Sequence, residues 1–338
     1  MKKIVSAALL SAALVLTGCS APAAQQAEHR SFFAMDTTMD FTVYGDVGLL
    51  DEAEALIRSL EKSVSVTDED SAVYAVNHNG TGTFSGVSAD LMEQALTLCR
   101  RTEGALDLSV YPIVRAWGFT TDNYQVPDEA VVQSLLPLVD YTRIQYDTAT
   151  GTAALPAGME IDLGSVAKGY AGQLTAQLLR DSGVQSALLN LGGNVQTVGA
   201  KPDGSPWQIG IKAPQGEDAM MVLSVTDQAV VTSGGYERYF EQDGKTYWHI
   251  MDPSTGHPAD SGLLSVTIVG EQGIVCDGLS TSLFVMGLEK AADLWAQSDD
   301  FEAVFVTTSG AVYITEGLKD CFALTEAYAD TPVSILER

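Results

Sequence analysis

Residues 161–170 have the composition of a site for phosphate oxygens. A short apolar run ends at Asp162, a turn is expected at residues 164–165, and the spacing predicts an amphipathic helix that runs to about residue 180. Free backbone N–H groups and the positive end of a helix would then lie beside Lys168. The stretch therefore suggests an anion site, although a strand–turn–helix corner with a solvated lysine is the simpler interpretation of these residues alone.

Asp277 and Thr281 are four residues apart near the start of a predicted helix that continues through Met286. This spacing puts both side chains on one helix face. Two oxygen donors suit a hard cation such as Mg²⁺, which usually keeps waters and substrate phosphates as its other ligands. The alternative is an acidic helix start with a capping role.

His249 ends a predicted strand over residues 246–250, and Asp252 opens the turn that follows. Asp252 could hold the imidazole ring, or could itself act as a general base. A histidine at a strand end is also a common structural feature, so the pair alone does not identify a catalytic site.

Several site classes are excluded by missing motifs. The sequence has no Cys/His cluster for zinc and no Gly-x-Ser-x-Gly motif of serine hydrolases. It also lacks the Gly-x-Gly-x-x-Gly motif of Rossmann dinucleotide sites and the Gly-x-x-x-x-Gly-Lys-Ser/Thr motif of Walker-type loops.

The composition predicts a folded, strongly acidic protein. The chain has 338 residues, of which 46% are hydrophobic, so it can build a sizeable core. It has 44 acidic and 18 basic residues, for a formal charge of −26. Such a surface repels nucleic acid and anionic lipid. An anionic ligand would need a local source of positive charge, such as a metal ion or a helix N-terminus.

The first 30 residues are expected to lie outside the folded domain. Residues 1–18 have a basic start and an apolar run, as in a secretory signal peptide, and Leu-Thr-Gly-Cys at residues 16–19 resembles the bacterial lipobox. Cleavage before Cys19 would remove two lysines and no acidic residue, so the charge of −26 would become −28. We expect a lipidated Cys19, a flexible tether to residue 30, and an extracytoplasmic, membrane-anchored protein. An ordinary secreted protein is the alternative.

Three further cysteines, Cys99, Cys276 and Cys321, lie in apolar surroundings. An odd number cannot all pair, so buried free thiols are expected. A disulfide between Cys99 and Cys321 is an alternative that the sequence does not decide.

The positions of the other elements follow from periodicity and from turn residues. Residues 32–44 predict a strand pair or one long strand, residues 104–119 an apolar aromatic loop that is either core or a pocket wall, and residues 187–191 a buried strand that runs into a double glycine. The remaining expectations are helices at 49–64, at 88–102 with Ser88 as cap and at 127–138 starting at Pro127, a short helix capped by Asp70 or Ser71, a hairpin at 143–155, a strand at 263–269 and a closing hairpin at 301–315.

Taken together, seven ordered motifs resemble the ApbE family, the FAD:protein FMN transferases. They stand at residues 35–39, 107–119, 162–170, 190–194, 233–238, 249–256 and 277–281, and the resemblance covers about residues 31–330. Three positions depart from the usual pattern: Asp36 stands where glycine is common, Ser109 where threonine is common, and Ser165 where glycine or alanine is common.

The resemblance implies a fold and a reaction. The fold would be a single α+β domain over residues 31–338, with mixed, mostly antiparallel sheets flanked by helices and related to the T-fold. FAD would bind with Mg²⁺, a Thr or Ser hydroxyl of a target flavoprotein would attack the phosphorus of the FMN half, and AMP would leave. The acceptor would be a membrane redox subunit or a secreted flavoprotein.

The resemblance also implies roles for individual residues. The metal ligands would be the carbonyl of Ser165 and the side chains of Asp277 and Thr281, and His249 near Asp252 would take the proton of the attacking hydroxyl with a pKa near the ordinary value of about 6.5. The cofactor-binding residues would be Met35, Asp107, Lys168, Asn190, Gly192, Gly193, Ser233 and Gly235.

Two alternatives stay open. The same site could hydrolyse FAD to FMN and AMP, with water in place of the protein hydroxyl. The chain could instead be a non-catalytic flavin-binding lipoprotein, which would have no need of Asp277 and Thr281 beside His249.

Overall fold

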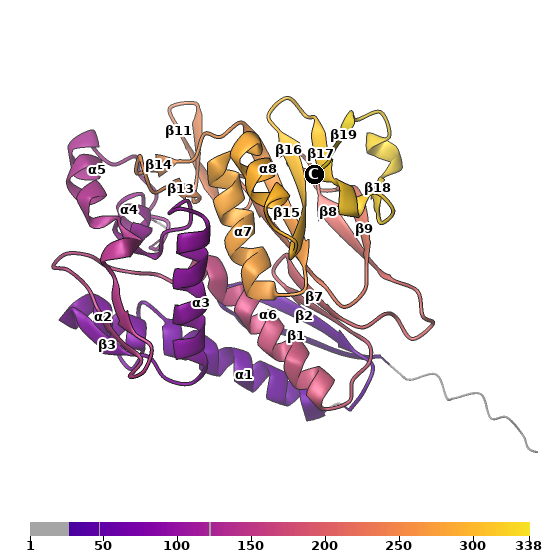
Figure 1. Cartoon of the computed structure of the whole chain (residues 1–338), viewed down its shortest axis with the longest axis horizontal. Coiled ribbons are helices and arrows are strands. Elements are labelled where there is room, and N and C mark those ends of the chain that lie inside the picture. Colours follow the sequence, from indigo (N-terminus) through magenta and orange to yellow (C-terminus); the bar gives the residue numbers. More distant parts are fainter. Residues whose placement is uncertain (1–26, 47, 122) are drawn as a thin grey trace, which may run out of the picture.

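The computed structural model of the chain describes residues 27–46, 48–121 and 123–338, and its elements are arranged around a nine-stranded sheet (Figure 1). All neighbouring strands in this sheet are antiparallel except the last two, β17 and β19, which are parallel. In order across the sheet, the strands are β1 (Glu28–Ala34), β2 (Thr37–Val43), β6 (Ala187–Leu191), β7 (Asn194–Val198), β10 (Ala229–Gly234), β15 (Leu263–Gly270), β16 (Phe301–Thr307), β17 (Val312–Thr315) and β19 (Val333–Leu336).

The structure also has four smaller sheets. They are the three-stranded sheets β18 (Phe322–Leu324), β9 (Ala219–Val225), β8 (Trp207–Lys212) and β3 (Thr81–Thr83), β5 (Thr152–Ala154), β4 (Gln145–Asp147), and the pairs β11 (Tyr239–Gln242) with β12 (Lys245–Trp248) and β13 (Met251–Asp252) with β14 (His257–Pro258). The hairpin expected at residues 143–155 is confirmed by β4 and β5.

The helices are α1 (Gly48–Val64), α2 (Ala72–Asn79), α3 (Val87–Arg101), α4 (Tyr111–Ala116), α5 (Glu129–Leu135), α6 (Gly164–Asp181), α7 (Gly273–Met286) and α8 (Leu288–Ala296), with short 3-10 turns η1 (Leu108–Val110), η2 (Leu136–Leu138), η3 (Tyr141–Arg143), η4 (Glu316–Leu318) and η5 (Glu326–Tyr328). The predicted α+β class with mostly antiparallel sheets is confirmed. Among the described residues, none of these helices has both the length and the apolar character needed to cross a bilayer. The predicted signal peptide and Cys19 lie outside the described residues.

The two faces of the large sheet bury different partners because successive side chains of a strand point to opposite faces. On β10, Val230 packs with Trp207 and Leu223 of the small β8–β9–β18 sheet. Its neighbour Val231 packs with Leu279 and other apolar residues of α7 and α8. Figure 1 shows the same arrangement, with α6, α7 and α8 in front of the sheet and β8 and β9 to one side. The helix-covered face is the one that carries the candidate site.

Helix α1 forms as its periodicity predicts. Its buried residues recur every three or four positions along one face: Leu50, Ala53, Ile57, Leu60 and Val64. Burial of each large aliphatic side chain contributes about 1.5–3 kcal/mol. Of the two predicted caps of α2, Ser71 is the one observed, because its side chain accepts a hydrogen bond from the N–H of Tyr74 at 2.8 Å.

Several predicted helix starts were wrong. Helix α3 begins at Val87, and the hydroxyl of Ser88 donates back to the carbonyl of Ser85 at 3.0 Å instead of capping the helix. Helix α5 begins at Glu129 with Asp128 as its N-cap, not at Pro127. The residues that precede the two helices are Gly86, with a φ of 53°, and Asp128, with a φ of −59°.

The two helices of the predicted site also start differently from expectation. Residues 164–165 are the first residues of α6 and not a turn, and no strand precedes them. Helix α7 begins at Gly273, so Asp277 lies in its second turn and is not an N-terminal capping acid. The apolar run before Asp277 has no residue that marks a helix start, which is why the sequence pattern placed it late.

Residues 104–119 are not an irregular loop, since they contain η1 and α4. Trp117 and Phe119 are fully buried and form a small core with Ile113, Val132 and Met251. The indole N–H of Trp117 donates to the carbonyl of Gly256 at 2.9 Å. These two aromatic residues are therefore core.

The three described cysteines are free thiols, so the alternative of a Cys99–Cys321 disulfide is not formed. Cys99 and Cys276 are buried and Cys321 is partly exposed. Burial raises the pKa of Cys99 to about 12, so this thiol stays protonated and unreactive at neutral pH.

Candidate functional site

The candidate site is built where α6 crosses α7. The backbone N–H of Gly169 on α6 donates to Oδ2 of Asp277 on α7 at 2.7 Å. The two backbones are in contact here, because a Cβ on Gly169 would lie 2.2 Å from the carbonyl oxygen of Gly273 and a Cβ on Gly273 would lie 2.3 Å from that of Gly169. Only glycine fits at both positions, and this contact brings the second turn of α6 to Asp277.

The same contact affects the carbonyl of Ser165. In a regular α-helix the N–H of Gly169 would bond the carbonyl of Ser165, four residues earlier. Its hydrogen bond to Asp277 competes for that N–H. The two predicted metal ligands, the carbonyl of Ser165 and the carboxylate of Asp277, are thus alternative acceptors for one N–H group, which bonds Asp277.

Asp277 is a buried acid whose negative charge is only partly compensated by its neighbours. The residue is 7% exposed. Burial raises its pKa to about 6, although the charge of Lys168, the N–H of Gly169 and the amide of Asn194 each act to lower it. A divalent cation would supply the missing positive charge and hold this carboxylate ionised.

Thr281 lies one turn further along α7 and meets Ser233 of β10. The hydroxyl of Ser233 is 2.8 Å from that of Ser280 and 3.2 Å from that of Thr281. The structure therefore brings together a residue predicted to line the nucleotide pocket and one predicted to bind the metal. The neighbouring Gly235 leaves no room for a side chain, because a Cβ there would lie 2.8 Å from the indole of Trp248.

Two hairpin turns lie side by side at one end of the large sheet. Met35 and Asp36 form the β1–β2 turn, with φ of 49° and 58°, and Gly192 belongs to the β6–β7 turn. A Cβ on Gly192 would lie 2.0 Å from the hydroxyl of Thr37, so the two turns touch. The left-handed φ of Asp36 is one that glycine adopts without strain, which gives a physical reason for glycine being usual at this position.

Hydrogen bonds fix both turns. The N–H of Met35 donates to the carboxylate of Glu61 on α1 at 2.6 Å. The side chain of Asn190 accepts from the N–H of Gly193 at 2.9 Å, which closes the second turn. Met35, Asn190, Gly192 and Gly193 are thus gathered at this end of the sheet, and their contact with a nucleotide stays a prediction.

Asp107 has structural partners of its own. Oδ1 accepts from the N–H and the hydroxyl of Ser109 at 2.8 and 2.6 Å, and Oδ2 accepts from the N–H of Tyr141 at 3.0 Å. The carboxylate therefore caps η1 and ties it to η3. The hydroxyl of Ser109 accepts in turn from the N–H of Asp140 at 2.8 Å, so the departure from threonine keeps the group that this network uses.

His249 is held by Arg238 and not by Asp252. Its Nδ1 lies 3.2 Å from the carbonyl oxygen of Arg238, and its backbone N–H donates to the same oxygen at 3.0 Å. The carboxylate of Asp252 accepts from the N–H and hydroxyl of Ser254 at 2.8 and 2.7 Å, within its own turn. Of the two roles open to Asp252, holding the ring is not observed, because Ser254 takes its side chain, and a role of Asp252 as a general base stays a prediction.

The environment of His249 also differs from expectation. Burial lowers its pKa to about 4, and the positive charges of Arg238 and Lys168 lower it further in the same direction. The predicted ordinary pKa near 6.5 was therefore wrong. The imidazole is neutral at pH 7, which leaves one ring nitrogen able to accept a proton.

The positive charge of Lys168 affects the pKa of several groups in this region. Its ammonium group acts on Asp277, on His249, on Glu237 and on Asp162, and burial is the largest influence on the pKa of each. Asp162 also accepts a hydrogen bond from the N–H of Gly164 at 3.0 Å, at the start of α6. The chain thus gathers Lys168, His249 and Asp277 around one region, as the motifs predict.

The donor set suits a hard cation. Within the part of the chain that the structure describes, no group of three or more His, Cys, Asp and Glu side chains could hold a metal. The candidate ligands are one carboxylate, a hydroxyl and a backbone carbonyl, all oxygens. Such a set fits Mg²⁺, which keeps several waters and substrate oxygens, better than zinc.

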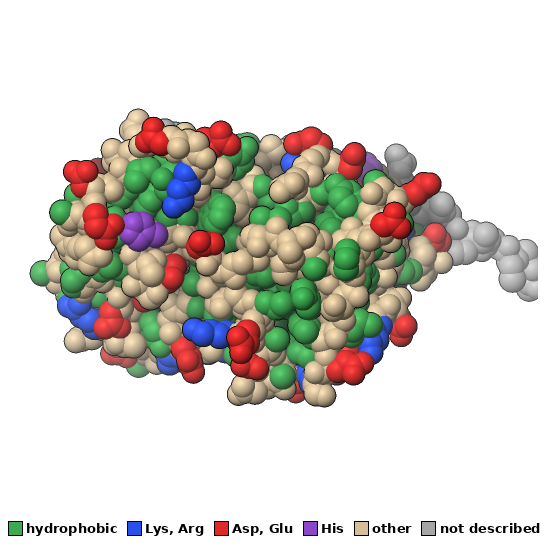
Figure 2. Space-filling view, turned by 90° about the horizontal axis from the view of Figure 1, so that it is seen from above, with side chains coloured by type: hydrophobic (Ala, Val, Ile, Leu, Met, Phe, Trp, Pro, Cys, Tyr) green, Lys and Arg blue, Asp and Glu red, His purple; other side chains and the backbone are tan. Residues whose placement is uncertain are grey.

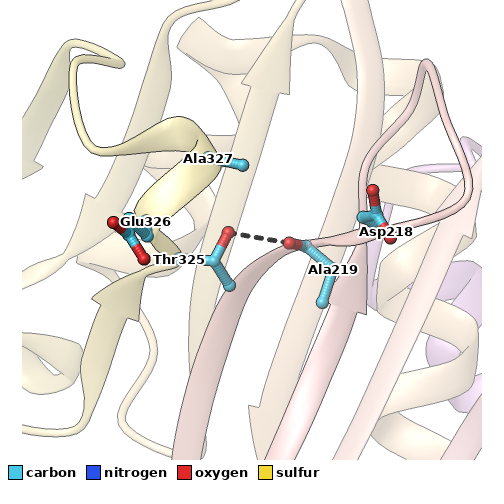
Figure 3. A pocket seen from close by; sticks show the side chains of 5 residues that line it. All are labelled: Asp218, Ala219, Thr325, Glu326 and Ala327. Atoms are coloured by element: carbon cyan, nitrogen blue, oxygen red, sulfur yellow. Dashed lines mark hydrogen bonds between the residues drawn. The ribbon is translucent and has the colours of Figure 1, made fainter.

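A pocket of about 560 Å³ lies elsewhere, between β9 and η5 (Figure 3). The hydroxyl of Thr325 donates to the carbonyl of Ala219 across it at 2.8 Å. Its charged lining residues are Asp218 and Glu326. With two carboxylates and no basic lining residue, it is a poor site for a diphosphate, so the α6–α7 junction is the better candidate.

The face of the molecule shown in Figure 2 has no broad region of positive charge. On the face shown in Figure 2, acidic side chains are spread among apolar ones, and Lys and Arg side chains do not form an extended patch. Local groups such as Lys168, the start of α6 and a metal ion must therefore attract an anionic ligand.

Sequence reasoning missed two residues of this site. Arg238 holds and polarises His249, and its position in a predicted motif gave no sign of this contact. Asn194 lies beside Asp277 as a buried amide. The only sequence feature that could have indicated it is an asparagine at the start of a strand in which polar and apolar residues are mixed.

Comparison with known proteins gives consistent matches. The family model described as the ApbE family matches residues 35–305. A protein of Klebsiella pneumoniae named FAD:protein FMN transferase is 35% identical over 276 residues, which cover 80% of this chain and 85% of the relative. A protein of Treponema pallidum with the same name is 32% identical over 297 residues, 82% of each chain.

Solved structures give the same result. The ApbE protein of Thermotoga maritima has a TM-score of 0.82 and 32% identity, and the match covers 88% of this chain and 99% of that one. The flavin transferase ApbE of Vibrio cholerae has a TM-score of 0.78 and 27% identity, with coverage of 88% and 100%. Both matches cover 88% of this chain and nearly all of the solved chain.

Proposed function

The chain belongs to the ApbE family and is a flavin transferase, and we propose that it uses Mg²⁺ to attach FMN from FAD to a Thr or Ser hydroxyl of an acceptor flavoprotein, with release of AMP. The transferase activity follows from the relatives, which carry the name FAD:protein FMN transferase. The metal, the phosphoester bond and the roles of single residues are our proposal.

The observation that carries the proposal is the contact between Gly169 and Asp277 at the α6–α7 crossing. It joins the helix of Ser165 to the helix of Asp277 and Thr281, and we propose that the carbonyl of Ser165 and the side chains of Asp277 and Thr281 hold Mg²⁺. The ion would neutralise charge on the pyrophosphate of FAD, which a protein surface this acidic would otherwise repel.

The chain's own groups then position the reactants. Lys168 and the N-terminal end of α6 offer positive charge to the phosphate oxygens of FAD. His249, neutral at pH 7, accepts the proton of the acceptor hydroxyl. The new bond forms between the hydroxyl oxygen and the phosphorus of the FMN half, and the bond from that phosphorus to the oxygen of the AMP half breaks.

The carbonyl of Arg238 supports this role of His249. It lies 3.2 Å from Nδ1 of His249, and it can only accept a hydrogen bond. A proton on Nδ1 would therefore be held there, and Nε2 would be the nitrogen that takes the proton from the acceptor.

The test is incubation of the full-length chain with FAD, Mg²⁺ and an acceptor domain that contains a target threonine, read by intact mass. A gain of one FMN on the acceptor that is lost with EDTA supports the proposal. Release of FMN and AMP without a mass gain would favour the hydrolase, and bound, intact FAD would favour a flavin-binding lipoprotein.

We also propose that the chain is anchored outside the cytoplasm through a lipid on Cys19, which lies outside the described residues. The motif at residues 16–19 supports this. A Cys19→Ser variant that still fractionates with membranes would contradict the proposed anchor.

A further inference from the structure

The β1–β2 turn has a strained backbone conformation. Ala34 pairs with Thr37, so Met35 and Asp36 alone form the turn. A two-residue turn of this kind requires positive φ at both positions, and the two residues have φ of 49° and 58°. Neither residue is glycine, and a side chain as large as that of Met35 disfavours this backbone region. The surrounding structure must therefore hold the turn in place.

The β6–β7 turn has the same geometry without the strain. Leu191 pairs with Asn194, so this turn also has two residues, Gly192 and Gly193, with φ of 66° and 91°. The side chain of Asn190 accepts from the N–H of Gly193 and closes the turn. Two glycines would form the β1–β2 turn equally well, and backbone strain that is retained in this way is common at ligand-binding sites.

Glu61 holds the strained turn from outside the sheet. It lies near the end of α1, and its Oε1 accepts from the backbone N–H of Met35 at 2.6 Å. This N–H lies outside the β1–β2 ladder, whose last pair is Ala34 with Thr37. A hydrogen bond from an N–H group to a carboxylate is stronger than one between neutral groups. The bond therefore restrains the turn against α1.

The restrained turn is in contact with the double glycine. A Cβ on Gly192 would lie 2.0 Å from Oγ1 of Thr37, the residue that follows the turn. A shift of the β1–β2 turn would therefore also change its contact with Gly192. Glu61 thus fixes Met35 directly, and through Thr37 it fixes how the two turns meet.

We propose that Glu61 is a positioning residue for FAD, which acts through Met35 and the β1–β2 turn and does not touch the nucleotide. The inference rests on the proposed function, because it needs FAD to bind at the two turns. Its expected effect has the opposite sign to that of charge. A carboxylate near an anionic nucleotide weakens binding, so loss of its charge alone would strengthen binding, whereas loss of positioning weakens it.

Glu54 provides the matched control. It lies seven residues before Glu61 and so on the same face of α1. Its carboxylate accepts from Arg30 of β1 at 3.0 Å and pairs with Arg58 at 2.8 Å. Glu54→Leu therefore also removes a carboxylate that links α1 to β1, but at a distance from the turn. Any change in its unfolding temperature should leave FAD affinity within about twofold of the wild type.

The test is titration of the full-length chain with FAD at saturating Mg²⁺ and without acceptor, followed by flavin fluorescence, with thermal unfolding measured separately. Glu61→Leu is expected to weaken FAD binding by about tenfold. Glu61→Gln keeps an oxygen that can accept from the N–H of Met35 and should recover most of the affinity. In the transfer assay, Glu61→Leu should raise KM for FAD and change kcat little, because the groups that act on the reacting atoms remain.

Equal FAD affinity in wild type, Glu61→Leu and Glu61→Gln would overturn the inference and leave the proposed function standing. The inference would also fail if Glu61→Leu bound FAD more tightly, as charge alone predicts, or if Glu54→Leu weakened binding as much as Glu61→Leu. A wild-type chain that binds no FAD would overturn the proposed function and this inference together.

Discussion

The backbone N–H of Gly169 donates to Oδ2 of Asp277 at 2.7 Å, across the closest approach of α6 and α7. Lys168 precedes this N–H by one residue, and Thr281 follows Asp277 by one helical turn. The groups proposed to bind phosphate and metal therefore keep their spacing only while the two helices stay in contact. The predictions below start from this relationship.

Gly169→Ala should damage both the fold and the site. A Cβ at this position would lie 2.2 Å from the carbonyl oxygen of Gly273 and 2.5 Å from Cβ of Asp277, and neither is the end of a flexible side chain. The helices must separate, at a cost of about 1–3 kcal/mol, and the bond to Asp277 is weakened. Urea unfolding measures the first effect and Mn²⁺ affinity measures the second.

Gly172→Ala is the control on the same helix. Its Cβ would lie 3.4 Å from a methyl group of Leu191 and 3.6 Å from Cβ of Gln196, which are ordinary contacts. Alanine in a helix interior is favoured over glycine by about 0.5–1 kcal/mol, so this variant should be as stable as the wild type or more so. A Gly169→Ala variant that behaves like Gly172→Ala would contradict the tight crossing.

The stability of the metal-free chain should fall as pH rises from about 4 to 6 because of Asp277. Burial raises its folded pKa from the ordinary 3.8 to about 6, so in this window the folded state holds a proton that the unfolded state has lost. Full ionisation above pH 6 then costs the folded state up to about 3 kcal/mol. Thermal unfolding in EDTA across this range measures the loss.

Asp277→Asn isolates that contribution, because it removes one titrating group from a chain with many other acids. The variant should be more stable than the wild type at pH 7 in EDTA, and the difference should vanish near pH 4. Added Mg²⁺ should raise the unfolding temperature of the wild type and not of the variant. Parallel pH curves for the two proteins would show that Asp277 is not the buried acid responsible.

How far the sequence could predict this arrangement depends on the range of the contacts. Helix α1 and the strands β6 and β15 follow from local apolar periodicity, and all three were predicted. Strand β19 was missed because most of its residues are exposed and it pairs only through its backbone with β17, so it carries no pattern of burial.

The site shows the same limit. The motifs identify which residues belong to it, but their partners are distant in sequence. Asp107 is bonded to the N–H of Tyr141, 34 residues away, and Gly169 to Asp277, 108 residues away. The partner of His249 could not be predicted either, because Asp252 is nearer in sequence than Arg238 and yet bonds within its own turn.

The pH profile of transfer should lack an acid limb near 6.5. Burial lowers the pKa of His249 to about 4, so this base stays neutral down to about pH 5. At saturating Mg²⁺, which keeps Asp277 ionised, the rate at pH 6 should equal that at pH 7. A rate that halves near pH 6.5 would show that His249 is not the base, or that it is exposed in the working enzyme.

Arg238→Met should move the acid limb to higher pH. The guanidinium is one of the two positive charges that lower the pKa of His249, while the backbone carbonyl that holds the ring remains in the variant. The rate at neutral pH should therefore change little compared with the rate at pH 5. An acid limb that stays in place in Arg238→Met would rule out this electrostatic influence.

Thr281→Val should weaken Mg²⁺ binding while the fold persists. Valine keeps the shape of threonine and removes the hydroxyl, which lies 3.2 Å from that of Ser233. We expect about a tenfold loss of affinity, recovered in part by excess Mg²⁺ in the transfer assay, and near-normal affinity in Thr281→Ser.

Ser280→Ala removes the adjacent hydroxyl, which bonds Ser233 and the carbonyl of Asp277, and should cost about 1 kcal/mol of stability without affecting metal affinity. If Thr281→Val and Thr281→Ser bind Mg²⁺ equally well, the hydroxyl of Thr281 is not a ligand and Asp277 must hold the ion with the backbone and water alone.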